Sequence, residues 1–102
     1  MTNMMAAAQA QLREMLLAAL GALVAEEKVP AEPIPTFKIE IPADKSHGDF
    51  AANIAMVSAK ALRMPPRKIA EMLTESLNFT GTYFERVEIA GPGFINFFLR
   101  KP

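Results

Sequence analysis

The stretch 90-AGPGFINFFL-99 holds one amide side chain, Asn96, among large apolar residues. In a β-strand alternate side chains share a face, so Asn96 should lie on the same face as Phe94 and Phe98. Proteins bind single-stranded nucleic acid by stacking a base on an aromatic ring and by hydrogen bonds to the base edge. The stretch therefore predicts a nucleic-acid contact if this face of the strand is open.

The same alternation assigns Ile95, Phe97 and Leu99 to the opposite face, which we expect to be the core. If helices cover only that face, two rings and the amide between them are displayed to solvent. If helices cover both faces, Asn96 is a buried amide that bonds to backbone or water. The pattern alone slightly favours the second alternative, because large apolar residues are usually inside.

A second group of polar residues lies in 46-SHGDFAAN-53. Gly48 permits a tight turn, and Asp49 can accept backbone N–H bonds as the cap of a helix that starts at Phe50. Asn53 would follow one turn later. This structural interpretation is favoured over a ligand role.

Catalytic and metal chemistry finds little support in the chain. Ser46, His47 and Asp49 are residue types of a nucleophilic triad, but neighbours in one loop rarely reach that geometry. His47 is the only histidine and there is no cysteine, which excludes the ordinary metal-ligand sets. There is no GxxxxGK[ST] or GxGxxG phosphate-binding motif. We expect no catalytic residue, no metal and no cofactor in this stretch.

The composition is that of one small domain. The 102 residues are 51% hydrophobic and carry 11 basic and 11 acidic side chains. This balance argues against capture of nucleic acid by bulk charge, and binding would need locally placed cations or base contacts. No signal peptide and no bilayer-spanning run are visible, and the lack of cysteine suits a reducing compartment. We expect a soluble, cytoplasmic protein.

The sequence ends with Arg100, Lys101 and Pro102 directly after an apolar stretch. Exposed charge and proline are typical of linkers between domains. We expect residues 1–102 to be a single domain from a longer chain.

Helix-forming residues dominate positions 4–27, which predict a long helix that Thr2 or Asn3 could cap. Three prolines make residues 28–36 an extended connector. Residues 37–41 alternate strictly and predict a half-buried strand. The apolar stripe expected on the first helix consists of Leu12, Met15, Leu16, Ala19, Leu20 and Leu23.

A second helix is expected from Phe50 to about Met64, and a third from Pro66 to about Asn78. Residues 83–90 and 94–100 predict two strands joined around Gly91, Pro92 and Gly93. This order of elements favours an α+β fold with two layers: a small, mostly antiparallel sheet with three helices packed on one face. The expected stripe of the second helix is Phe50, Ile54, Val57, Ala61 and Met64, and that of the third is Ile69, Ala70, Leu73 and Leu77.

Two runs, GDFAANIAMVSAKALRMPPRKIAEML and VEIAGPGFINFFL, closely resemble the N-terminal domain of arginyl-tRNA synthetases. In that family a GDF/Y-A-x-N stretch, a helix pair split by proline and a GPGFIN-like hairpin occur in this order. The resemblance covers about residues 28–100. The residues that carry the two motifs are Gly48, Asp49, Asn53, Gly91, Pro92 and Gly93.

The resemblance implies a part in the enzyme that uses ATP to charge tRNA(Arg) with arginine. The corresponding domain contacts a base of the tRNA D-loop, at the outer corner of the molecule. Its contacts are an aromatic residue and an amide, which match Phe94 and Asn96 here. Phe98 is a further candidate from its position in the strand alone. The partners implied are the tRNA(Arg) D-loop and the catalytic and anticodon-binding domains of the same full-length chain.

The HIGH-like and KMSKS-like signatures of that ligase are absent from these residues. The resemblance therefore implies that ATP and arginine bind elsewhere in the full-length enzyme, and that this stretch is no enzyme alone. Cations that could meet tRNA phosphates are Lys45, Arg63, Arg67, Lys68, Arg86, Arg100 and Lys101.

A protein–protein docking or scaffold module is the alternative from another class. It would use apolar residues of the first helix, namely Met4, Met5, Met15 and Leu16. The competing interpretation is that this stripe packs on the protein's own sheet.

Overall fold

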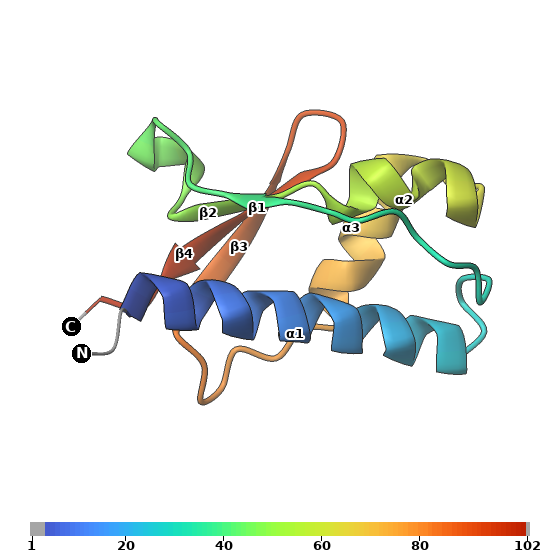
Figure 1. Ribbon diagram of the computed structural model, residues 1–102, viewed down its shortest axis with the longest axis horizontal. Coiled ribbons are helices and arrows are strands. Elements are labelled where there is room, and N and C mark those ends of the chain that lie inside the picture. Colours follow the sequence, from blue (N-terminus) through green and yellow to red (C-terminus); the bar gives the residue numbers. More distant parts are fainter. Residues whose placement is uncertain (1–3, 102) are drawn as a thin grey trace.

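A four-stranded antiparallel sheet with the order β1-β2-β4-β3 organises the structure. The computed structural model describes residues 4–101. The helix α1 lies along one side of the sheet, and α2 and α3 pack together at one end (Figure 1). This arrangement confirms the α+β class. The elements are α1 (Met4–Ala25), β1 (Ile39–Glu40), the 3-10 turn η1 (Lys45–His47), β2 (Phe50–Ala52), α2 (Ile54–Leu62), α3 (Pro66–Glu75), β3 (Phe84–Ala90) and β4 (Phe94–Leu99).

The first helix forms as expected and packs onto its own sheet. Its buried residues repeat every three or four positions, which is the helical period. Side chains of α1 also bond to backbone beyond the helix: the Gln9 amide donates to the Ile39 carbonyl at 2.9 Å. Residues 2 and 3, the expected caps, lie outside the described residues. The buried residues of α1 are Ala8, Leu12, Leu16, Ala19 and Leu23, with Met15 and Leu20 half-buried.

The second helix begins later than the sequence predicted. Residues Phe50–Ala52 form the strand β2, which pairs with both β1 and β4, and α2 begins only at Ile54. The short run is a strand because neighbouring strands satisfy its backbone on both sides, and such pairing overrides local helix propensity. The prediction of a helix from Phe50 was therefore wrong at its start.

The buried stripe of α2 is also rotated relative to the prediction. Val57, Ala61 and Met64 are only half-buried, and the buried residues are Ile54, Ala55, Ser58 and Leu62. The third helix starts at Pro66 as expected but ends at Glu75. It buries Ile69, Ala70 and Leu73, while Leu77, beyond its end, is half-buried.

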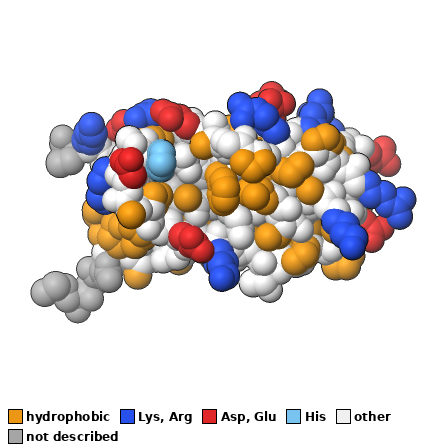
Figure 2. Space-filling model, turned by 90° about the horizontal axis from the view of Figure 1, so that it is seen from above, with side chains coloured by type: hydrophobic (Ala, Val, Ile, Leu, Met, Phe, Trp, Pro, Cys, Tyr) orange, Lys and Arg blue, Asp and Glu red, His pale blue; other side chains and the backbone are white. Residues whose placement is uncertain are grey.

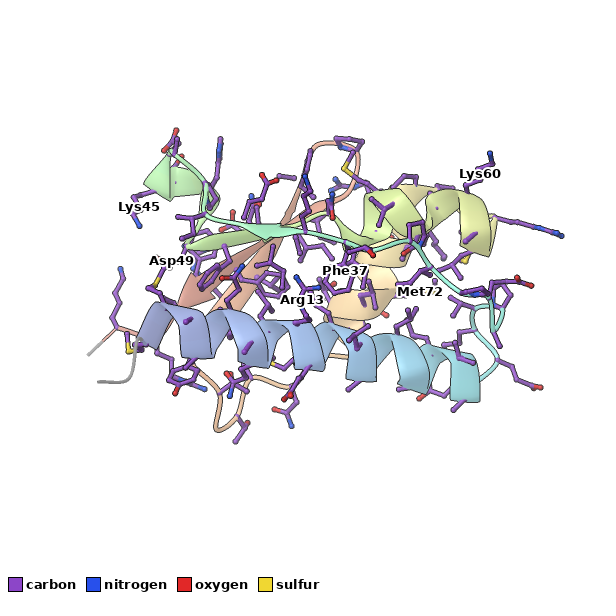
Figure 3. The ribbon with its side chains drawn as sticks, in the orientation of Figure 1. Arg13, Phe37, Lys45, Asp49, Lys60 and Met72 are labelled. Atoms are coloured by element: carbon purple, nitrogen blue, oxygen red, sulfur yellow. The ribbon has the colours of Figure 1, made fainter. Side chains whose placement is uncertain are left out.

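The first strand is shorter than the predicted 37–41. Phe37 and Ile39 are buried, but Ile41 is 57% exposed because the pairing with β2 stops at Glu40 and Pro42 follows. The Arg13 guanidinium lies 4.7 Å from the centre of the Phe37 ring and ties the connector to α1 (Figure 3). Edge-to-face contacts at 5.9–6.1 Å join the rings of Phe50, Phe84 and Phe97 in the core. None of the helices within residues 4–101 is long and apolar enough to cross a membrane.

Candidate nucleic-acid interface

The strand β4 is central in the sheet, with β2 on one side and β3 on the other. Its residues Ile95 and Phe97 are fully buried in the core that α1 covers. Alternation therefore places Phe94, Asn96 and Phe98 on the outer face of the sheet, as the sequence predicted.

Phe94 is the exposed ring of this outer face. It begins β4, opposite Ala90 of β3, and 41% of its surface is accessible. The face of the molecule that carries the β3–β4 turn shows apolar side chains gathered over its middle, with charged side chains around its border (Figure 2). An exposed aromatic ring on a strand is a stacking surface for a base.

Asn96 is nearly covered by its neighbours in the sheet. Only 6% of its surface is exposed, because residues of both adjoining strands flank it: Ala51 of β2 and Glu88 of β3. Of the two alternatives that the sequence left open, the buried amide therefore agrees with the structure and the displayed amide does not. A residue of a central strand has side-chain neighbours on both sides, and a short amide is easily covered by larger ones.

The Asn96 amide nevertheless has no hydrogen-bond partner among residues 4–101. Within that range the Ser58 hydroxyl is the one fully buried side-chain polar atom that lacks a partner. Both polar atoms of the Asn96 amide therefore keep contact with solvent. The Asn96 side chain is nearly covered by its neighbours, and its two N–H donors and its carbonyl acceptor form no hydrogen bond with any residue in 4–101.

Phe98 differs from Phe94 because the protein's own cation covers it. The Arg86 guanidinium carbon lies 3.6 Å from the centre of the Phe98 ring, and Arg86 also forms an ion pair with Glu88. Phe98 is half-buried beneath this pair. The sequence had no signal for this cover, because it depends on the β3–β4 register that places Arg86 opposite Phe98.

The Gly91-Pro92-Gly93 turn is held against the start of α3. Gly93 has φ +147°, and a Cβ on it would lie 2.9 Å from Cβ and 3.0 Å from the carbonyl carbon of Pro66. Only glycine fits this position without a shift of backbone. The Arg67 guanidinium also donates to the Gly91 carbonyl at 3.1 Å. These contacts set where Phe94 leaves the turn.

Asp49 joins β4 instead of capping a helix. Its backbone N–H donates to the Phe97 carbonyl at 2.8 Å, and its carboxylate accepts from the Leu99 N–H at 2.9 Å. The predicted cap was wrong because the chain from Phe50 is a strand. Gly48, at φ +93°, allows this approach, since a Cβ there would lie 2.8 Å from the Phe97 oxygen. Asp49 thus continues the β2–β4 pairing with its side chain.

Asn53 connects β1 to the start of α2. Its side-chain oxygen accepts from the Lys38 N–H at 2.7 Å, and it makes no side-chain bond to the first turn of α2. In the intact fold, Gly48, Asp49 and Asn53 therefore make contacts that hold strands together.

The loop before β2 has no relay geometry. The Ser46 hydroxyl donates to the Asp44 carboxylate at 2.8 Å, away from a bond with His47 or Asp49. Hydrogen bonds from the Ser46 backbone and hydroxyl lower the pKa of the Asp44 carboxyl. No cluster of three or more metal-ligating side chains is found in the part of the chain that the structure describes.

Residues 10–99 match the family described as the arginyl tRNA synthetase N terminal domain. The chain belongs to this family. It is 44% identical over 101 residues to arginine–tRNA ligase of Caldanaerobacter subterraneus, covering 99% of this chain and 18% of the relative. It is 49% identical over 92 residues to the ligase of Desulforamulus reducens, covering 90% of this chain and 16% of the relative.

A solved structure shares the fold of this arginyl-tRNA synthetase N-terminal domain. The crystal structure of arginyl-tRNA synthetase from Plasmodium falciparum superposes with a TM-score of 0.68 at 19% identity, over 91% of this chain and 16% of that one. The chain therefore spans less than a fifth of the length of these relatives. It corresponds to one domain of a ligase and lacks the catalytic domain.

Two groups can be distinguished among the cations that could contact phosphate, and the first group already has partners within the domain. Arg100 donates to the carbonyls of Thr82 at 2.8 Å and Phe79 at 2.6 Å, so its role is structural. Arg86 covers Phe98, and Lys45 lies 3.9 Å from the Asp49 carboxylate. The second group lies at the corner between the end of α2 and the start of α3 and consists of Lys60, Arg63, Arg67 and Lys68.

Proposed function

We propose that this domain binds tRNA(Arg) at the D-loop, and so supports the charging of that tRNA by the full-length, cytoplasmic ligase. ATP and arginine would bind to the other domains of the ligase. One observation carries the proposal: an exposed ring, Phe94, stands two residues from Asn96, whose amide has no internal partner. Both side chains lie on the outer face of the same strand.

In this proposal a D-loop base stacks on the Phe94 ring. A stacked base contributes about 1–3 kcal/mol to binding. The base edge then lies over Asn96, because side chains two residues apart on a strand are neighbours on one face. The amide offers two donors and an acceptor to that edge. Because the amide is nearly covered, it can form hydrogen bonds only with a base whose edge extends between the neighbouring side chains.

Phe98 has a different role in this proposal. Its ring is already covered by the Arg86 guanidinium, so a base could stack there only by displacing Arg86 from Phe98 and from Glu88. Phe98 thus supports Arg86, and Phe94 is the stacking ring.

The test uses Phe94→Ala and Asn96→Ala in the full-length ligase. The loss of stacking should raise KM for tRNA(Arg) roughly 5- to 150-fold in Phe94→Ala, which is the kinetic equivalent of about 1–3 kcal/mol. The KM values for ATP and arginine should not change.

A matched control is Leu17→Ala. Leu17 is 49% exposed on α1, whose buried side covers the inner face of the sheet, so Leu17 points away from Phe94. It should leave tRNA kinetics unchanged. If KM for tRNA is unaltered in both β4 variants, the assigned contacts are rejected.

A docking role has one supporting observation and one against it. A surface pocket of about 320 Å³ is lined by Met4, Tyr83 and Leu99, among others, and Tyr83 is 39% exposed. Leu16, which a docking helix would present, is fully buried. Docking to the other ligase domains predicts that Tyr83→Ala lowers the melting temperature of the full-length enzyme and leaves KM for tRNA unchanged.

A further inference from the structure

One segment of the chain has a net positive charge because it lacks acidic residues. From Phe50 to Ala70 the sequence carries Lys60, Arg63, Arg67 and Lys68 and no acidic residue. Because the whole chain has a formal net charge of zero, the rest of it has an acidic excess. This imbalance creates a local positive potential that the overall composition hides.

The four cations of this segment lie at the corner between the end of α2 and the start of α3, which adjoins the turn before Phe94. Gly93 packs against Pro66, and the Arg67 guanidinium bonds to the Gly91 carbonyl. Lys60 projects from the side of α2 that faces away from α1 (Figure 3). In Figure 2, Lys and Arg side chains lie along the border of the turn-bearing face at its α2 end. Arg67 therefore ties this basic corner to the turn that precedes Phe94.

Two of these four cations have no bonding partner among the residues that the structure describes. Lys60 and Arg63 are exposed and make no ion pair or side-chain hydrogen bond with any other residue in 4–101. Arg67 has the Gly91 carbonyl and, at 4.0 Å, the Glu71 carboxylate. Lys68 shares the exposed side of α3 with Glu71 and Glu75, by helical spacing, so its charge is offset.

Arg63 stands where the backbone favours another residue. It follows the last residue of α2 with φ +56°, in the left-handed region. Glycine is the usual residue at such a helix end, since a side chain there costs about 1 kcal/mol or more. The backbone therefore does not account for an arginine at this position.

We propose that Lys60 and Arg63, with Arg67 between them and the turn, bind the sugar–phosphate backbone of the RNA whose base stacks on Phe94. The inference rests on the proposed function and deepens it by naming the phosphate-binding surface. Charge complementarity and the bond from Arg67 to the turn that precedes Phe94 carry it. Phosphate contacts position the RNA, while Phe94 and Asn96 contact the base.

Phosphate binding by these cations makes the affinity for tRNA depend on salt concentration. A cation that neutralises a phosphate releases condensed counterions, so the logarithm of the binding constant falls linearly with the logarithm of salt concentration. Removal of one such cation lowers the magnitude of that slope by about 1. Base stacking makes no comparable contribution.

The experiment measures tRNA(Arg) binding to the full-length ligase over a range of salt concentrations. In the Lys60→Ala/Arg63→Gly double variant the affinity should fall and the slope should decrease by about 2. Arg63→Gly should not lower the melting temperature, because glycine suits the left-handed backbone. Unfolding therefore cannot explain the loss.

Lys45→Ala is the matched control, since Lys45 is an exposed lysine at the opposite end of the molecule from Lys60 (Figure 3). It should leave the slope unchanged. A decrease in slope in the double variant alone supports the inference. An unchanged slope in the double variant, or a decrease of about 1 in Lys45→Ala, overturns it.

The outcome separates this inference from the base contact. Phe94→Ala should weaken binding at every salt concentration and leave the slope unaltered. If Phe94→Ala and Asn96→Ala bind normally while the double variant loses slope, the base contact fails and the phosphate surface stands. The reverse result removes the phosphate surface and keeps the base contact.

Discussion

On the inner face of β4, Ile95 and Phe97 have no exposed surface, whereas on the outer face Phe94 keeps 41% of its surface accessible and Asn96 keeps 6%. The inner residues pack against the core that α1 covers. On the outer face, Phe94 directly follows a turn whose Gly93 packs against Pro66 of α3. One strand thus supplies stability from one side and a candidate contact surface from the other. The difference shows that burial of hydrophobic rings and display of an aromatic ring can follow from the same two-residue period.

Two buried polar side chains, Ser58 and Asn96, have no hydrogen-bond partner among residues 4–101. On the core side, the Ser58 hydroxyl of α2 is fully buried and unpaired. On the outer side, the Asn96 amide is nearly covered but still meets solvent. The first destabilises the fold, because a sealed polar group loses its water without compensation. The second keeps its bonding capacity for a ligand.

The largest effect is expected when the ring on the inner face of β4 is truncated, in comparison with truncation of the ring on its outer face. Phe97→Ala should lower the free energy of unfolding by about 3–5 kcal/mol, because it opens a cavity among Phe50, Phe84 and the residues around them. Phe94→Ala should change it by less than about 0.5 kcal/mol, as for most surface substitutions. Urea denaturation of the domain measures both. Similar losses in the two variants would contradict the division of β4 into a core face and a contact face.

A smaller loss is expected at the turn that joins β3 to β4. Gly93→Ala should cost about 1–3 kcal/mol, since the new methyl group meets Pro66 backbone and the backbone is strained at φ +147°. Gly21→Ala is its control: nothing lies within 4 Å of a Cβ there, and alanine in a helix should stabilise by about 0.5–1 kcal/mol. Thermal melts of the two variants should therefore shift in opposite directions. Equal shifts would mean that the turn does not rest on Pro66.

The smallest effect is expected at Ser58, one of the two buried polar side chains that lack a partner. Ser58→Ala should raise the free energy of unfolding by about 1 kcal/mol, because it removes a sealed hydroxyl and keeps the helix. Denaturant titration measures this gain. A loss of stability would instead show that the hydroxyl finds a partner in solution.

Elements with a long local pattern could be predicted from the sequence. The helix α1, the hairpin of β3 and β4, and the alternation of Ile95 and Phe97 with Phe94 all follow from periodicity within one segment. The helix break at Pro65 and Pro66 is equally local. These features needed no knowledge of the rest of the chain.

The predictions that were wrong concern features that depend on residues far apart in the chain. The sequence around Asp49 suits a helix cap, but the Leu99 N–H, fifty positions away, binds its carboxylate. That pairing makes Phe50–Ala52 a strand, and this strand makes β4 central. The central position in turn covers Asn96 from both sides.

By itself, the sequence determined the periods of its helices and strands and which side chains of β4 share a face, because spacing along one segment decides these. The tertiary structure alone decided that Asn96 would be nearly covered, that Arg86 would lie over Phe98, and that the basic corner would adjoin the Phe94 turn. Those results come from strand register and from contacts between distant segments, which no local pattern encodes.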